Sequence, residues 1–211
     1  MDNTLYDFYH AKTEACTKVA ELAEAGEGAE LFRYFLHGPH GFEHHHNIRD
    51  YLQDRDIFSE KLYLEACAVY EEEKIGSLRL YPGVEETIRA LHARGVKLAI
   101  VTDAETTQAE KRMRAIGLRH YFDTVVTPDI SGRRKPNPDT FLTALEHLGE
   151  TPEVGWVVGD SPKREIEPGN ALGMKTIYAK YGDWIGIPYP QIVPHYTIRS
   201  FNEIKTIFGL E

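Results

Sequence analysis

The residues most able to do chemistry are acidic side chains that directly follow predicted strands. The segment 155–159 is typical of a buried strand; Asp160 follows it at once and Glu165 comes five residues later. Mg²⁺ prefers carboxylate oxygens, usually from one or two residues. We therefore expect Asp160 to bind a cation, and Glu165 to hold a water molecule or to orient a lysine. The alternative is that Asp160 caps a helix and Glu165 is solvated.

A lysine just before a predicted helix could add a positive charge to such a site. Lys135 lies in the segment 133–141, where Asn137 can cap a helix that begins at Pro138. Pro136 favours an extended conformation at Lys135. A lysine held in this way can direct its ammonium group at a phosphoryl group or a carboxylate. Otherwise it is a solvated loop lysine.

A hydroxyl group follows another predicted strand. The apolar run 96–101 ends in Thr102 and Asp103. A threonine hydroxyl followed by backbone amides that open toward a helix can bind a phosphate oxygen. A threonine in this place can equally be a cap or turn residue.

The first residues of the sequence carry a further acidic group. Asp2, Asn3, Thr4 and Leu5 form a phrase that is expected just after a buried strand, yet no strand precedes Asp2. The other candidate residues all point to an acidic site at this place, so Asp2 belongs with them.

The elements that must position these residues alternate between strands and helices. Strands are expected at 96–101, within 121–127, and at 155–159, 175–179 and 195–198, and helices at 84–94, 108–116, 138–148, 168–172 and 201–208. This alternation predicts an α/β fold with a doubly wound parallel sheet. In such a sheet ligands bind beyond the carboxyl ends of the central strands.

The region between residues 8 and 75 has a different pattern. Apolar residues such as Phe8, Ala11, Ala15 and Val19 recur at helical spacing, and no strand is evident. About four helices fit these repeats. We expect residues 8–75 to form a helical-bundle cap domain, inserted into a Rossmann-like core of residues 1–7 and 76–211.

Composition excludes several classes of protein. Lys and Arg number 24 against 33 Asp and Glu, which gives a formal charge of −9. That charge argues against a nucleic-acid partner. Cys16 and Cys67 are too few for a disulfide framework, and no apolar run suits a membrane span. We expect a cytoplasmic protein.

Together these motifs resemble the haloacid dehalogenase superfamily, whose common members are Mg²⁺-dependent phosphatases with a doubly wound core and a helical cap. Asp2-Asn3-Thr4 is similar to the second half of the family's Asp-x-Asp-x-Thr motif. Thr102 matches the second motif, Lys135 the third in its Lys-Pro-x-Pro form, and Asp160 with Glu165 the acidic fourth. The agreement covers nearly the whole chain. Glu165 departs mildly, because Asp is more usual there.

The resemblance implies that the nucleophile lies outside these residues. In the family it is the first Asp of the first motif, which would stand one residue before Met1. The chain as given is therefore expected to lack the nucleophile and its strand, and to be inactive. In a second register Asp2 itself is the nucleophile, but Leu5 and Tyr6 would then fall where small turn residues belong.

The remaining roles follow from the same resemblance. Asp2 would be the general acid and base. Its carbonyl and the carboxylate of Asp160, with Glu165 beside them, would hold Mg²⁺ as the cofactor. Thr102, Lys135 and the backbone at Asp103 would bind the phosphate and stabilise its charge.

The cap is expected to select the substrate. The resemblance implies that Tyr9, His10 and His40 could contact the group that carries the phosphate. The histidine-rich segment 37–46 also raised a second possibility, a metal site made of His40, Glu43 and His44.

Three functions are compatible with these observations. The first is a phosphatase of a small phosphorylated metabolite, acting as a monomer or homodimer. The second is a non-catalytic relative that binds a phosphorylated ligand or a protein. The third is a dehalogenase, which Asp2 disfavours because the dehalogenases of the family lack an acid at this position.

Overall fold

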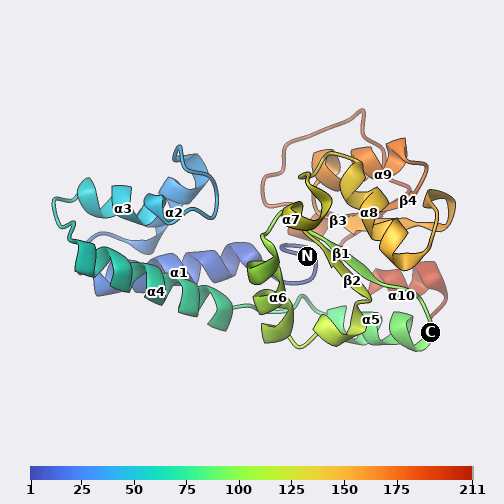
Figure 1. Cartoon of the computed structure of the whole chain (residues 1–211), viewed down its shortest axis with the longest axis horizontal. Helices are drawn as coiled ribbons and strands as arrows, with labels where there is room; N and C mark the ends of the chain where they lie inside the picture. Colours follow the sequence, from blue (N-terminus) through green and yellow to red (C-terminus); the bar gives the residue numbers. More distant parts are fainter. Residues whose placement is uncertain (211) are drawn as a thin grey trace. The chain divides into compact units, whose positions relative to one another are not determined.

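The computed structural model describes residues 1–210. The chain divides into two compact units (Figure 1), one made of Met1–Asp7 and Leu80–Glu211 and the other of Phe8–Arg79, with Glu211 outside the described residues. We call them the core and the cap. The chain passes from the cap back to the core between Arg79 and Leu80, whereas the sequence predicts this boundary between residues 75 and 76.

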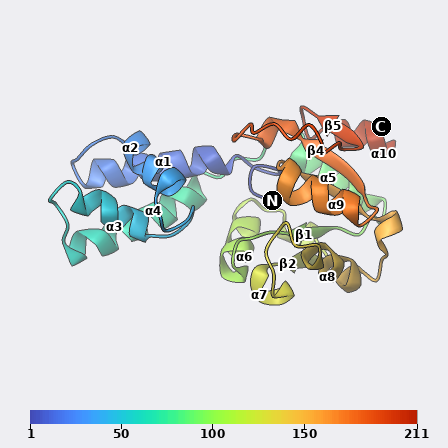
Figure 2. The ribbon, with the colours of Figure 1, turned by 90° about the horizontal axis from the view of Figure 1, so that it is seen from above.

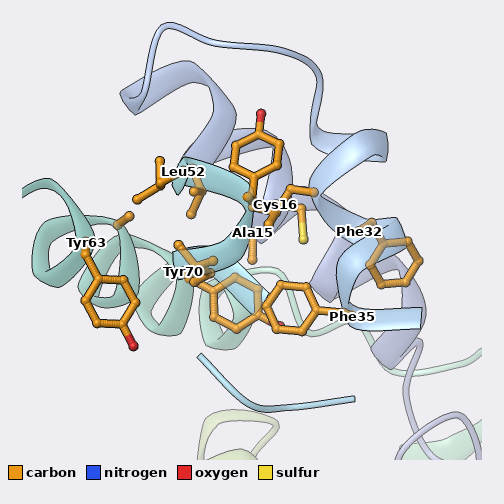
Figure 3. Packing of buried hydrophobic residues seen from close by; sticks show 12 residues of the cluster. Ala15, Cys16, Phe32, Phe35, Leu52, Tyr63 and Tyr70 are labelled. Atoms are coloured by element: carbon orange, nitrogen blue, oxygen red, sulfur yellow. The ribbon is translucent and has the colours of Figure 1, made fainter. Parts of the chain in front are cut away.

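The cap consists of four helices: α1 (Phe8–Leu22), α2 (Gly28–His37), α3 (His46–Gln53) and α4 (Glu60–Gly76). The predicted number of helices is confirmed. Their apolar faces form one cluster, in which the rings of Phe35 and Tyr70 stack with centroids 4.9 Å apart (Figure 3). This side-chain packing, rather than helix propensity, supplies most of the stability of such short helices.

The cap also buries a lysine among aromatic rings. Lys12 is 0% exposed; its Nζ lies 3.8 Å from the ring centroid of Phe42 and 4.3 Å from that of Phe35, and it donates to the carbonyl of Phe42. A desolvated ammonium group is stabilised by the negative faces of such rings. The charge of Lys12 is therefore part of the cap's interior.

The described part of the core contains five strands, all in parallel pairs. β1 (Ala99–Val101) pairs with β2 (Thr124–Val126), while β3 (Trp156–Gly159), β4 (Lys175–Ala179) and β5 (Tyr196–Ile198) form a second sheet in that order. The predicted α/β fold with parallel strands is confirmed.

The helices of the core follow the predicted alternation. They are α5 (Val84–Ala93), α6 (Thr106–Ala115), α7 (Pro128–Ser131), α8 (Asp139–Leu148), α9 (Glu167–Ala171) and α10 (Glu203–Phe208), with short helical turns η1 (Arg119–Tyr121), η2 (Pro152–Val154), η3 (Pro162–Ile166) and η4 (Lys180–Gly182). Figure 2 shows α6, α7 and α8 gathered around β1 and β2. No helix within residues 1–210 is both long and apolar enough to cross a membrane.

Two local predictions need correction. The expected strand 96–101 is shorter, because the amide of Val96 still bonds to Leu91 at the end of α5 and only Ala99–Val101 pair with β2. The segment before α9 forms a π-helical turn, η3, that the sequence did not predict. Such turns are rare and frequently occur at functional sites.

A groove separates the two sheets of the core. Among the described strands, β1 pairs only with β2, and β3 pairs on one side only, with β4. The cavity between them has a volume of about 460 Å³ and is lined by both strands and by apolar side chains of α5, α8 and α10. Met1, Lys135 and Glu165 are also part of its lining, and Lys135 contacts the carbonyl of Val101 at the carboxyl end of β1.

Candidate active site

Asp160 lies directly after β3, in a position that requires glycine before it. A β-carbon at Gly159 would come within 2.6 Å of Cβ of Glu165, so only glycine fits. The hydroxyl of Thr4 donates to Oδ1 of Asp160 at 2.7 Å, which joins the first segment of the chain to the end of β3. Burial, with Glu165 nearby, raises the pKa of Asp160 to about 6. The hydrogen bond from Thr4 and the charge of Lys135 lower this pKa, but they do not offset burial and the neighbouring Glu165.

Lys135 and Glu165 form a buried ion pair. Their side chains are 6% and 9% exposed, and Nζ lies 2.6 Å from Oε1. The other carboxylate oxygen of Glu165 accepts the amide of Ser161 at 2.9 Å. Burial opposes the charge of Glu165, but Lys135 and Arg164 hold its pKa below the usual value. Glu165 is thus not solvated, and of its expected alternatives the orientation of a lysine fits this geometry.

The end of β1 reaches the same lysine. The Nζ of Lys135 also donates to the carbonyl of Val101 at 3.2 Å. Thr102 is 5% exposed, and its hydroxyl oxygen accepts the amide of Ala104 at 3.2 Å. The hydroxyl hydrogen of Thr102 remains able to donate to an anion.

The carboxylate of Asp103 bonds to other parts of the core. Oδ1 accepts the amide of Lys135 at 2.9 Å, and Oδ2 pairs with Arg164. Because both carboxylate oxygens are engaged, a phosphate-binding role for Asp103 would fall to its backbone amide. The peptide bond between Lys135 and Pro136 is cis.

Asp2 is held by two side chains of the core. Nη1 of Arg112 lies 3.0 Å from Oδ2, and the hydroxyl of Tyr6 donates to Oδ1. Burial would raise the pKa of Asp2, but Arg112 and the other neighbours lower it. Arg112 is 0% exposed, and the sequence does not predict its contact with Asp2, because Arg112 is one more charge in the run Glu110-Lys111-Arg112 of α6.

The donor set suits a hard cation that keeps most of its water. Within residues 1–210 no group of three or more His, Cys, Asp and Glu side chains is arranged to hold a metal ion. Mg²⁺ does not need such a group, because one or two carboxylates, backbone oxygen and water complete its octahedron. The carboxylate of Asp160 is an oxygen ligand of this kind at the end of β3, and the carbonyl of Asp2 as a second ligand stays a prediction.

The three predicted substrate contacts belong to the cap. The ring of Tyr9 packs edge-on against Phe32, with centroids 4.8 Å apart. His10 is exposed and lies 3.8 Å from Glu14, and His40 is 2.9 Å from Asp50. Their contact with a substrate stays a prediction.

The alternative metal site in the cap is not formed. Glu43 lies 3.9 Å from Lys74, and His40 is bonded to Asp50. No cluster in the part of the chain that the structure describes could hold a metal with these ligands. The structure therefore does not support the second possibility for this segment, a metal site made of His40, Glu43 and His44.

The fold and the strand-end residues define the class of protein. A family model described as haloacid dehalogenase-like hydrolase matches residues 1–173, and the chain belongs to this family. The family resemblance expected from the sequence is confirmed.

Curated relatives include several phosphatases. The chain is 38% identical over 122 residues to a phosphoglycolate phosphatase of Aquifex aeolicus, covering 58% of the chain and 54% of the relative. It is 31% identical over 153 residues to a glyceraldehyde 3-phosphate phosphatase of Methanocaldococcus jannaschii, covering 71% and 65%. The matches thus span about half to two thirds of these relatives.

Solved structures share the fold over nearly the whole chain. A haloacid dehalogenase-type phosphatase from Thermococcus onnurineus superimposes with a TM-score of 0.68 at 24% identity, covering 100% of the chain and 96% of the neighbour. A 2-haloacid dehalogenase from Pseudomonas syringae gives 0.67 at 21%, covering 99% and 95%. Because both chemistries occur on this fold, the activity must be argued from the site.

Proposed function

We propose that this protein is a Mg²⁺-dependent phosphatase of a small phosphorylated metabolite. The observation that carries the proposal is the buried Lys135–Glu165 pair with the half-buried carboxylate of Asp160 beside it, at the carboxyl ends of β1 and β3. One lysine faces two carboxylates there, and burial together with Glu165 raises the pKa of Asp160 in spite of Lys135. The phosphatase names of several relatives support the same reaction class.

The proposed mechanism uses an aspartate one position before Met1. Its carboxylate attacks phosphorus, the bond to the leaving oxygen breaks, and Asp2 gives a proton to that oxygen. Water then attacks the aspartyl-phosphate, Asp2 takes a proton from the water, and phosphate and the aspartate are released. Mg²⁺, held by Asp160 and the carbonyl of Asp2, would neutralise charge on the phosphoryl group.

Lys135 and Thr102 have the anion-binding roles in this proposal. The ammonium group of Lys135, kept in place by Glu165 and the carbonyl of Val101, would bind a phosphoryl oxygen. The hydroxyl of Thr102 would donate to another. Fixed donors of this kind stabilise the transition state without reorganising during the reaction.

The groove between β1 and β3 supports this position for the nucleophile. Its lining is largely apolar and includes the inner edges of both strands, so it suits a parallel strand that is buried on both faces. At one end Lys97 lies 2.7 Å from Glu150, and at the other are Met1 and the Lys135–Glu165 pair. A strand of about four or five residues would span the length of β3 and end beside Met1.

The test is hydrolysis of an aryl phosphate by a form in which a short apolar strand and an aspartate precede Met1. We expect turnover that requires Mg²⁺ and disappears when that aspartate is replaced by asparagine. Lys135→Ala and Asp160→Asn should abolish it, whereas Lys111→Ala and Glu146→Gln, exposed members of the same residue classes, should not. A folded, extended form that is inert toward every phosphate ester tried would overturn the proposal in favour of a non-catalytic relative.

A further inference from the structure

The segment after β4 packs against the first residues of the chain. Tyr181 and Gly182 lie in η4, and the hydroxyl of Tyr181 donates to the carbonyl of Thr4 at 2.5 Å. Thr4 in turn donates to Asp160. Tyr181 thus bonds directly to Thr4, and Thr4 bonds directly to Asp160, the proposed cation ligand.

Gly182 packs directly on the neighbouring peptide. A β-carbon at this position would overlap the carbonyl oxygen of Asn3, lie 2.8 Å from the carbonyl carbon of Asn3, and lie 3.1 Å from Cβ of Asp160. The φ angle of Gly182 is not positive, so space rather than backbone conformation requires glycine here. Any side chain would displace either Asn3 or Asp160.

The ring of Tyr181 packs against Tyr81, which in turn contacts Trp184. The rings of Tyr181 and Tyr81 pack edge-on with centroids 4.8 Å apart, and the amide of Tyr81 donates to the carbonyl of Leu5 at 3.0 Å. The indole of Trp184 donates to the hydroxyl of Tyr81 at 3.3 Å. Burial, with Tyr81 and Asp160 nearby, raises the pKa of Tyr181, which keeps its hydroxyl a donor.

The restrained segment turns at a residue in a left-handed conformation. Asn3 has φ of 54°, in a region that asparagine adopts more often than most residues with a β-carbon. This turn presents the carbonyl of Asn3 to Gly182. The carbonyl of Asp2, the proposed backbone ligand of Mg²⁺, belongs to the peptide group that ends at Asn3.

We infer that Tyr181 and Gly182 are positioning residues that hold residues 2–5 in the geometry needed to bind the cation. They act through the backbone of Asn3 and Thr4, and neither residue is assigned contact with the substrate. The inference rests on the proposed function for its cation, while the restraint on residues 2–5 can be measured without one.

The experiment combines two measurements on the full chain. Hydrogen exchange of the amides of Thr4 and Leu5 reports the restraint, and calorimetric titration with Mg²⁺ reports the site. For Gly182→Ala we expect exchange to become at least about tenfold faster and Mg²⁺ to bind about tenfold or more weakly. For Tyr181→Phe, which removes one hydrogen bond, both effects should be about fivefold.

Two control variants separate positioning from general destabilisation. Tyr178→Phe removes the bond between Tyr178 and Asp183 in the same region, and Gly76→Ala adds a methyl group where nothing lies within 4 Å. Neither should change the exchange of Thr4 and Leu5 or the affinity for Mg²⁺ by more than about twofold. If Gly182→Ala does not fold, Tyr181→Phe carries the test.

The outcomes distinguish this inference from the proposed function. If the unsubstituted chain binds no Mg²⁺, the proposed cation site fails and the inference falls with it, even if the amides of Thr4 and Leu5 are restrained. If it binds Mg²⁺ but both variants behave like the controls, the positioning role is overturned while the phosphatase proposal stands. Faster exchange together with weaker Mg²⁺ binding in the variants supports the inference.

Discussion

Both units of this protein bury charged groups, but they compensate them differently. In the cap, Lys12 lies against aromatic rings and a carbonyl, and Lys74 lies 2.5 Å from Glu71. In the core, one buried lysine faces Glu165 and Asp160, and the pKa of Asp160 is raised to about 6. Burial of a charge therefore does not by itself indicate a functional site. A buried charge that its neighbours compensate only in part does indicate one, because a bound ligand can supply the remaining opposite charge.

The largest effect should come from the charges of the core. Lys135→Met is expected to lower kcat of an active form by on the order of a thousandfold, as for the loss of one strong transition-state donor. Methionine keeps most of the volume but leaves the buried carboxylate of Glu165 without its ammonium partner, so the free energy of unfolding should also fall by about 3–5 kcal/mol, and kcat is compared per folded molecule. Steady-state kinetics and a thermal melt check this. A loss of activity that tracks a loss of folded protein would place Lys135 with the structural lysines of the cap.

The packing of the cap should matter for stability and not for chemistry. Phe35 is 2% exposed and stacks on Tyr70, so Phe35→Ala is expected to lower the free energy of unfolding by about 3–5 kcal/mol. Urea denaturation of the full chain measures the change, and circular dichroism shows whether the helices persist. Hydrogen exchange of Thr4 and Leu5 serves as the control and should stay as in the unsubstituted chain; faster exchange there would contradict the separation of roles.

Thr102 tests whether a small polar group in the core acts on the anion. Thr102→Val keeps the shape but removes the hydroxyl, and is expected to raise the Kd for inorganic phosphate by about tenfold. Thr102→Ser, which keeps the hydroxyl, should bind within about threefold of the parent. Equal affinities of the valine and serine variants for phosphate would show that the hydroxyl of Thr102 does not bind the anion and that Thr102 is only a turn residue.

The smallest effect should appear in the pH dependence of the cap. Hydrogen bonds with Cys67 and Glu71 raise the pKa of His45 to about 9 from an ordinary value of 6.5. The folded state thus binds the proton more tightly than the unfolded chain. This stabilisation is fully present below pH 6.5 and is lost as the pH rises through about 9.

Thermal melts at pH 6.5, 7.5 and 9 measure this change. The melting temperature of the parent should fall relative to that of His45→Gln across this range, because glutamine does not titrate. Parallel curves for His45→Gln and the parent would show that the proton on His45 does not stabilise the cap.

The elements of the fold were largely predictable. The alternation of strands and helices predicted β3 and β4 closely, because apolar runs bounded by glycine are a local signal. The length of β1 was not predictable, since Asp123 and the end of α5 decide which residues are left to pair. The π-helical turn η3 was also missed, because its conformation depends on Glu165 reaching Lys135 and Ser161.

The sequence by itself determined the family, the alternating elements and the identity of Asp2, Lys135, Asp160 and Glu165 as candidates, because residue type and spacing along the chain carry that information. Only the tertiary structure decided which partners these side chains have. Arg112 on Asp2 and Gly182 against Asn3 join residues more than a hundred positions apart. Such contacts depend on how the strands and helices pack, and no local pattern in the sequence records them.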